Sequence, residues 1–143
     1  MKRKIFLSAT LTASLWWSHP AQAADTSVQP EARAQTAPVP HKKDAADDPA
    51  IWIHPTNPES SLILGTDKQG GLHTYNLDGT PNELVSDGSK PNNVDVFYGF
   101  KLDGRTVDLA IASVRGGKKA SGVKVWAIDA ATRRLSDVTD AFL

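Results

Sequence analysis

The stretch SLILGTDKQGGLHTYNLDG, residues 61–79, decides the fold because it recurs further along the chain. It can be laid on VDLAIASVRGGKKASGVKVWAIDA, residues 107–130, with four extra residues in the turn of the second copy. In both copies, two short runs of branched and aromatic residues flank a glycine-containing turn, which is the pattern of a β-hairpin. The alignment sets Thr66-Asp67-Lys68 on Ser113-Val114-Arg115 and Gly71-Leu72 on Gly122-Val123.

The repeat also includes the strand that precedes each hairpin. DDPAIW (47–52) matches NNVDVF (92–97) with a shift of 45 residues, and the later strands are shifted by 47 and 51 residues. A period of this size, with three or four strands in each unit, is typical of a β-propeller blade. We therefore expect an all-β protein that contains about two blades of a β-propeller.

Short runs rich in branched and aromatic residues account for most of the chain after residue 46, and none has a helical stripe. Residues 135–143 look like the start of one more strand. Because propellers close with about four to eight blades, we expect the chain to be an N-terminal part of a longer protein. The expected strands are 50–54, 62–66, 72–77, 94–100, 107–114 and 123–128, with core aromatic residues Trp52, Tyr75, Phe97, Phe100 and Trp126.

The N-terminal residues indicate export. Residues 1–23 combine Lys2-Arg3-Lys4, an apolar run and a small-residue end at Ala23, which is the pattern of a secretory signal peptide cleaved after Ala23. We therefore expect a secreted or periplasmic protein. Residues 24–46 are rich in Ala, Pro, Gln and Thr and predict a flexible arm, which leaves residues 47–143 for the partial propeller domain.

Composition excludes several classes of function. Removal of residues 1–23 takes away three of the sixteen Lys and Arg and none of the sixteen Asp and Glu, so the mature chain carries a net charge of −3. No basic stripe supports nucleic-acid binding. The chain has no cysteine for disulfides, and no stretch after the signal peptide approaches the roughly 20 apolar residues that span a membrane.

Asp47 and Asp48 are adjacent carboxylates with no cation beside them in the sequence. A solvated turn would tolerate the pair, and a bound hard cation such as Ca²⁺ would also explain it. The equivalent positions of the second repeat are Asn92 and Asn93, which are common turn formers. Both pairs would lie on one rim of the assembly if the two strand ends point the same way.

Lys68 and Arg115 occupy equivalent strand ends in the two repeats. An ammonium and a guanidinium that lie close together suit a phosphate group, although solvated strand-end charges are the ordinary alternative. The histidines of the strands, His54 and His73, have no metal-ligand partner at short spacing and are expected to be satisfied or exposed. Lys118-Lys119 predicts a solvated hairpin turn.

Four motifs in order resemble the N-terminal blades of the β-propeller phytases. They are DDPAIWIHP (47–55), GTDKQGGL (65–72), NNVDVFYGF (92–100) and the position of Arg115, and the resemblance covers roughly residues 44–130. Members of that family are six-bladed propellers that bind several calcium ions and hydrolyse phosphomonoesters of phytate, myo-inositol hexakisphosphate. The resemblance implies the same fold, calcium as cofactor, phytate or another phosphorylated small molecule as substrate, and a monomer when full length.

The resemblance also implies roles for individual residues. Asp47 and Asp48 would be calcium ligands, together with the backbone carbonyls of Pro49 and Val94. Lys68 and Arg115 would bind phosphate, and water activated by calcium would attack phosphorus without a covalent nucleophile. The supporting turn would be formed by Asn92, Asn93 and Asp95.

Three departures from the family pattern predict weaker or altered substrate binding. Gln69 stands where a second Lys is frequent, Phe97 stands where Arg is common, and Val114-Arg115-Gly116-Gly117 replaces a more polar run. Two rival interpretations remain open at this point. One is a non-catalytic periplasmic propeller that binds calcium, and the other is an inactive truncated remnant.

Overall fold

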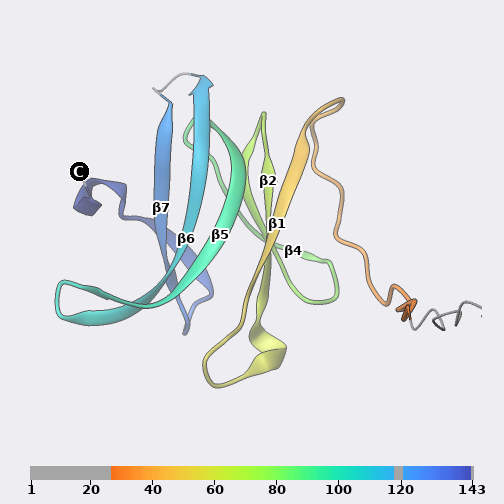
Figure 1. The fold of residues 1–143 in the computed structure, drawn as a ribbon, viewed down its shortest axis with the longest axis horizontal. Helices are drawn as coiled ribbons and strands as arrows, with labels where there is room; N and C mark the ends of the chain where they lie inside the picture. The colour runs from red at the N-terminus through yellow and green to blue at the C-terminus, as the bar shows by residue number, and fades with distance from the viewer. Residues whose placement is uncertain (1–26, 118–120, 143) are drawn as a thin grey trace, which may run out of the picture. The chain divides into compact units, whose positions relative to one another are not determined.

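Eight β-strands form two four-stranded antiparallel sheets in the computed structural model, which describes residues 27–117 and 121–142 (Figure 1). The chain divides into residues 1–31 and 32–143, and every strand lies in the second unit. The first sheet holds β1 (Ala46–Trp52), β2 (Leu62–Asp67), β3 (Gly71–Tyr75) and β4 (Pro81–Val85). The second holds β5 (Ser89–Leu102), β6 (Arg105–Gly117), β7 (Gly122–Asp129) and β8 (Arg134–Asp137).

Helical structure in the described ranges is limited to two short 3₁₀ turns, Pro58–Ser60 and Thr139–Phe142. None of the helices described there is long and apolar enough to cross a membrane. The all-β prediction is therefore confirmed. The predicted signal peptide at residues 1–23, and Lys118-Lys119, lie outside the described residues.

Strand registers confirm the repeat residue by residue for the first three strands of each sheet. The β1–β2 pair Pro49–Gly65 corresponds to the β5–β6 pair Val94–Ala112. The hairpin pairs Asp67–Gly71 and Val114–Gly122 correspond in the same way. The last hairpin of each sheet departs from the repeat. Tyr75 and Trp126 are equivalent residues, but Tyr75 pairs with Pro81 next to a bulge, whereas Trp126 pairs with Asp137.

Three strand predictions need correction. The prediction missed β4 because its sequence, PNELV, is mostly polar and begins with proline. The further strand expected to start at residue 135 is present but short: it is β8, which ends at Asp137, pairs with β7 and completes the second sheet before the 3₁₀ turn. The strands β5 and β6 are longer than predicted at both ends, and at the hairpin tip Asp103 (φ 48°) and Gly104 (φ 76°) form a tight turn with two positive φ angles.

The hydrophobic core lies between the two sheets. Trp52 is fully buried, and its indole Nε1–H donates a hydrogen bond of 2.8 Å to Asp108 Oδ2 of β6. Burial of large aliphatic and aromatic side chains from both sheets in one cluster removes apolar surface from water, which is the main stabilising contribution to the fold. The buried cluster consists of Trp52, Leu62, Leu64, Leu72, Val94, Ala110, Ala112, Trp126, Ile128 and Leu135.

Three of the five predicted core aromatic residues, Tyr75, Phe97 and Phe100, are not part of this buried cluster. Trp52, Tyr75 and Trp126 are buried, whereas Phe97 is 54% exposed and packs edge-on against Phe100 at 6.2 Å between ring centroids. Val94 of β5 is buried against the first sheet. Because side chains alternate along a strand, Phe97, three residues further on, points to the opposite face.

Repeat-equivalent positions should therefore differ in their contribution to stability. Trp52→Ala should lower the free energy of unfolding of the 143-residue chain by about 3–5 kcal/mol, since it empties a packed site. Phe97→Ala should change it by less than about 1 kcal/mol because the side chain is largely exposed. Urea unfolding followed by tryptophan fluorescence and circular dichroism measures both, and equal losses would contradict the burial described here.

Candidate functional site

The segment before β1 lies along the first sheet. Ala37 N–H donates to Gly79 O at 2.9 Å, Gln69 Nε2 donates to Lys42 O at 3.0 Å, and Lys68 N–H donates to Ala45 O at 2.8 Å. Gly79 has φ +87°, and a Cβ there would lie 2.0 Å from Gln35 O, so this close approach requires glycine.

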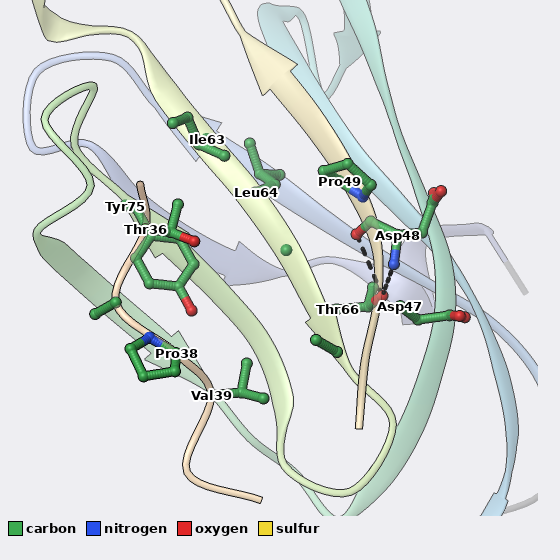
Figure 2. Close-up of a pocket in the computed structure, with 13 residues that line it drawn as sticks. Thr36, Pro38, Val39, Asp47, Asp48, Pro49, Ile63, Leu64, Thr66 and Tyr75 are labelled. Carbon is green, nitrogen blue, oxygen red and sulfur yellow. Dashed lines mark hydrogen bonds between the residues drawn. The ribbon is translucent and has the colours of Figure 1, made fainter. Parts of the chain in front are cut away.

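This docked segment encloses a cavity of about 240 Å³ against the first sheet. Figure 2 shows Thr36, Pro38 and Tyr75 around it, while the carboxylates of Asp47 and Asp48 point away from it. Asp47, Asp48 and Pro49 nevertheless line the cavity, so it borders the predicted ligand site.

Lys68 is the centre of a charged cluster at the end of β2. Its Nζ lies 2.8 Å from Asp44 Oδ1 and 2.9 Å from Asp47 Oδ1, and its side chain is only 13% exposed. The hydrogen bonds to Asp44 and Asp47 raise the pKa of Lys68 above its usual value. Asp47 thus has a cation beside it in space, although none is adjacent in the sequence.

Arg115 belongs to the same electrostatic environment. The hydrogen bond and charge of Lys68 hold the pKa of Asp44 below its usual range, and the positive charge of Arg115 adds to that effect. The two cations predicted to bind phosphate therefore act on one carboxylate. Because Arg115 is on β6, this end of the molecule combines charges from both sheets.

Asp48 connects the two sheets through its carboxylate. Its Oδ2 accepts a hydrogen bond of 3.0 Å from the backbone N–H of Val94 on β5. Its own N–H donates to Thr66 Oγ1 at 3.0 Å (Figure 2). The residue next to it, Pro49, pairs with Gly65 of β2.

Asn92 and Asn93 lie within β5 rather than in a turn, which corrects the expectation from the sequence. They fall at a break in the β5–β6 register between Pro91 and Val94. Asn92 Nδ2 donates to Asn93 Oδ1 at 2.7 Å, so the side chains bond to each other. Asp95, the third member of the predicted supporting turn, is an exposed residue of β5 opposite Ile111.

The residues present supply part of a hard-cation site. Asp47 and Asp48 each use one carboxylate oxygen in the contacts above, which leaves one oxygen apiece for a cation. Carboxylate and backbone oxygens are the ligands that Ca²⁺ prefers, usually six to eight of them. Within the described ranges, no group of three or more His, Cys, Asp or Glu side chains is arranged to hold a metal. The donor set therefore fits calcium chemistry but needs further oxygen ligands.

A buried histidine–aspartate cluster beside this site was not predicted. Asp67 is fully buried, and its Oδ2 lies 2.6 Å from His41 Nδ1 and 3.7 Å from His73 Nε2. Burial raises the pKa of Asp67, but hydrogen bonds from His41 and from the Gln69 N–H outweigh that effect and hold the pKa below its usual value. Sequence spacing gives no signal for this cluster, because it depends on where the segment before β1 docks.

The two strand histidines, His54 and His73, differ in whether their ring nitrogens have hydrogen-bond partners. His54 is satisfied, as predicted: Nε2 donates to Ala130 O at 2.9 Å, and Nδ1 accepts from the N–H groups of Thr56 and Asn57. His73 is neither satisfied nor exposed, since its Nε2 is buried without a hydrogen-bond partner in the described structure. Burial lowers the pKa of His73, and the charge of Asp67 only partly opposes that effect.

Two antiparallel sheets that share one core, with carboxylates and cations gathered at one end, define an all-β protein with a candidate site for a cation and an anion. A model of the phytase family matches residues 3–142, and the chain belongs to the phytase family. It is 44% identical over 109 residues to a protein named 3-phytase from Bacillus subtilis (strain 168). That match covers 76% of this chain and 28% of the relative, so the chain spans well under half of the relative's length.

The pKa of His73 predicts a specific pH dependence of stability. Its folded-state pKa lies below the unfolded value of about 6.5. Between these two pKa values the unfolded state binds more protons than the folded state. The stabilising contribution of His73 is therefore present above about pH 6.5 and is lost as the pH falls toward the folded-state pKa. His73→Phe removes the titration and preserves a ring that can stack on Tyr75, as His73 does at 6.0 Å.

The measurement is urea unfolding of the wild type and of His73→Phe between pH 7.5 and 5. The difference in unfolding free energy should shift in favour of the variant as the pH falls. Parallel pH curves for the two proteins would contradict the assigned role of His73.

Proposed function

We propose that the chain forms two blades of a β-propeller phytase, which hydrolyses phosphomonoesters of phytate in a calcium-dependent reaction and releases inorganic phosphate. The observation that carries the proposal is the charged cluster of Lys68, Asp44 and Asp47 with Arg115 nearby. It occurs in a chain that is 44% identical to a protein named 3-phytase. Phosphate recognition and cation binding both have suitable groups there.

The way in which the two sheets pack supports the propeller. The core face of the first sheet carries Trp52 and Leu64, whereas the equivalent residues of the second sheet, Phe97 and Ile111, lie on the face opposite to its core residues Val94 and Ala110. The two repeats therefore meet through non-equivalent faces. A head-to-tail interface of this kind can be repeated by the same rotation until a ring closes.

Lys68 and Arg115 are suited to bind and orient a phosphoryl group. An ammonium group has three N–H donors, and Lys68 uses two of them on Asp44 and Asp47, which leaves one for a phosphate oxygen. Arg115 can donate two parallel hydrogen bonds to phosphate oxygens. Both charges would also stabilise negative charge that develops on the transferring group.

Calcium would be held by the carboxylates of Asp47 and Asp48, helped by the backbone carbonyls of Pro49 and Val94. When bound, it supplies positive charge and activates water for attack on phosphorus. The Val94 N–H donates to Asp48 Oδ2, and this bond holds the carboxylate in place. The remaining ligands would come from parts of the propeller that this chain does not contain.

The two proposed phosphate ligands can be tested by substitution. Lys68→Ala and Arg115→Ala should each lower kcat/KM for phosphate release from phytate by about 10²-fold or more, since each removes a charged donor from the transferring group. The assay uses the protein encoded by the complete native reading frame. Arg105→Ala is the matched control because Arg105 is an exposed residue at the other end of β6.

Calcium dependence is tested on the same protein. Phosphate release should be lost after chelation with EGTA and return when calcium is added. Unchanged release after chelation would refute the proposed cofactor, and unchanged release in both alanine variants would refute the site. Calcium binding without any phosphate release would favour the non-catalytic calcium-binding propeller.

We also propose that the protein is secreted or periplasmic, from the signal-peptide pattern of residues 1–23. The mature protein recovered from outside the cytoplasm should begin at Ala24. N-terminal sequencing or intact-mass measurement tests this, and an uncleaved chain retained in the cytoplasm would contradict it.

A further inference from the structure

Thr66 places a buried hydroxyl at the junction of β1, β2 and β5. Its side chain is 1% exposed and lies on β2, next to Asp48 of β1. Its Oγ1 accepts the Asp48 N–H at 3.0 Å and lies 2.6 Å from Asn92 O of β5 (Figure 2 shows the bonds to Asp48). The distance to Asp48 O is longer, 3.3 Å. A hydroxyl has one proton to donate, and the shorter distance assigns that proton to Asn92 O.

Both backbone groups that Thr66 satisfies lie where the regular strand pairing is interrupted. The β1–β2 register shifts between Ala46 and Pro49, and the β5–β6 register shifts between Pro91 and Val94. A bulge takes backbone groups out of the ladder, and buried ones need another partner. Thr66 supplies that partner for one group in each sheet.

The repeat contains the same device a second time. Ser113, the equivalent of Thr66, accepts a hydrogen bond of 3.3 Å from the N–H of Asn93, the equivalent of Asp48. A hydroxyl at this position thus supports the interrupted strand in both sheets. In the first sheet the supported residue is Asp48, whose carboxylate reaches Val94 of the second sheet.

We propose that Thr66 is a positioning residue for the calcium site, which fixes the Asp48 carboxylate relative to the β5 backbone at Asn92 and Val94. This inference rests on the proposed function, since it takes Asp48 as a calcium ligand. Thr66 touches neither substrate nor metal and acts through Asp48. Removal of its hydroxyl leaves the Asp48 N–H without its acceptor and Asn92 O without its donor, so the ligand loses its fixed place.

The expected effect is a weaker calcium site in a folded protein. Thr66→Val keeps the shape of the side chain and removes the hydroxyl, and it should raise the calcium Kd by about 10–100-fold, the range for loss of a group that orients a metal ligand. Thr66→Ser retains the hydroxyl and should bind calcium nearly as well as the wild type. Isothermal titration with calcium chloride alone, on the protein from the complete native reading frame, measures these affinities.

Thr74 provides the matched control. It is fully buried on β3 of the same sheet, and its hydroxyl accepts a hydrogen bond of 2.9 Å from Asn82 Nδ2, away from Asp48. Thr74→Val makes the same chemical change without touching the site. A second readout is amide hydrogen exchange of Asp48 and Val94 in calcium-free protein, which should become faster in Thr66→Val and stay unchanged in Thr74→Val.

Asp48→Asn separates the two proposals. If Asp48→Asn binds calcium as the wild type does, or the wild type binds none, the proposed calcium site is wrong and the role of Thr66 is overturned with it. If Asp48→Asn weakens binding and Thr66→Val does not, only the role of Thr66 is overturned. If Thr74→Val weakened calcium binding as much as Thr66→Val does, Thr66 would be a structural residue and not a positioning residue.

Discussion

The structure depends on one contact between the two sheets. The face of the first sheet that carries Trp52 is buried against the face of the second sheet that carries Val94 and Ala110. Trp52 lies at its centre and is fixed by the hydrogen bond to Asp108, so the indole is both packed and satisfied. A blade-like sheet has two faces, and the apolar residues of each face need a neighbouring sheet to bury them. The same contact brings β5 beside β1 and β2 and so assembles the charged end of the molecule.

The candidate site lies where the regular strand pairing of both sheets is interrupted. Asp48 and Asn92 sit at register shifts in β1 and β5, and bulges of this kind redirect side chains and free backbone groups for other contacts. The lost ladder bonds are replaced by Thr66 and by the Asp48 carboxylate. The Asp48–Thr66 bond joins β1 to β2 within the first sheet, whereas the bonds to Asn92 O and from the Val94 N–H cross to β5 of the second sheet.

The repeat predicted most of the fold because equivalent residues keep their register. The repeat also set Lys68 on Arg115, and in the structure Lys68 directly follows β2 while Arg115 lies near the C-terminal end of β6. It did not predict that Phe97 would be exposed while Trp52 is buried. A repeat shows which residues share a face of a sheet, but not what covers that face.

The contacts made by the segment before β1 could not be predicted for a different reason. The bonds of Asp44 to Lys68 and of His41 to Asp67 join residues 24 and 26 positions apart, and one partner in each pair comes from a stretch without periodicity. Such a stretch offers no pattern from which its path can be inferred. Only the docking of residues 35–45 on the first sheet brings these groups together.

The adjacent carboxylates Asp47 and Asp48 have different partners in the folded chain. Asp47 is paired with Lys68, and Asp48 accepts the Val94 N–H, so these contacts offset the mutual repulsion of the two carboxylates. A cation that bound the folded state here would stabilise it by mass action, by an amount that rises with the logarithm of its concentration relative to its Kd. The two carboxylates are thus held in place by groups of the protein itself, Asp47 by a side chain that follows β2 and Asp48 by the backbone of β5.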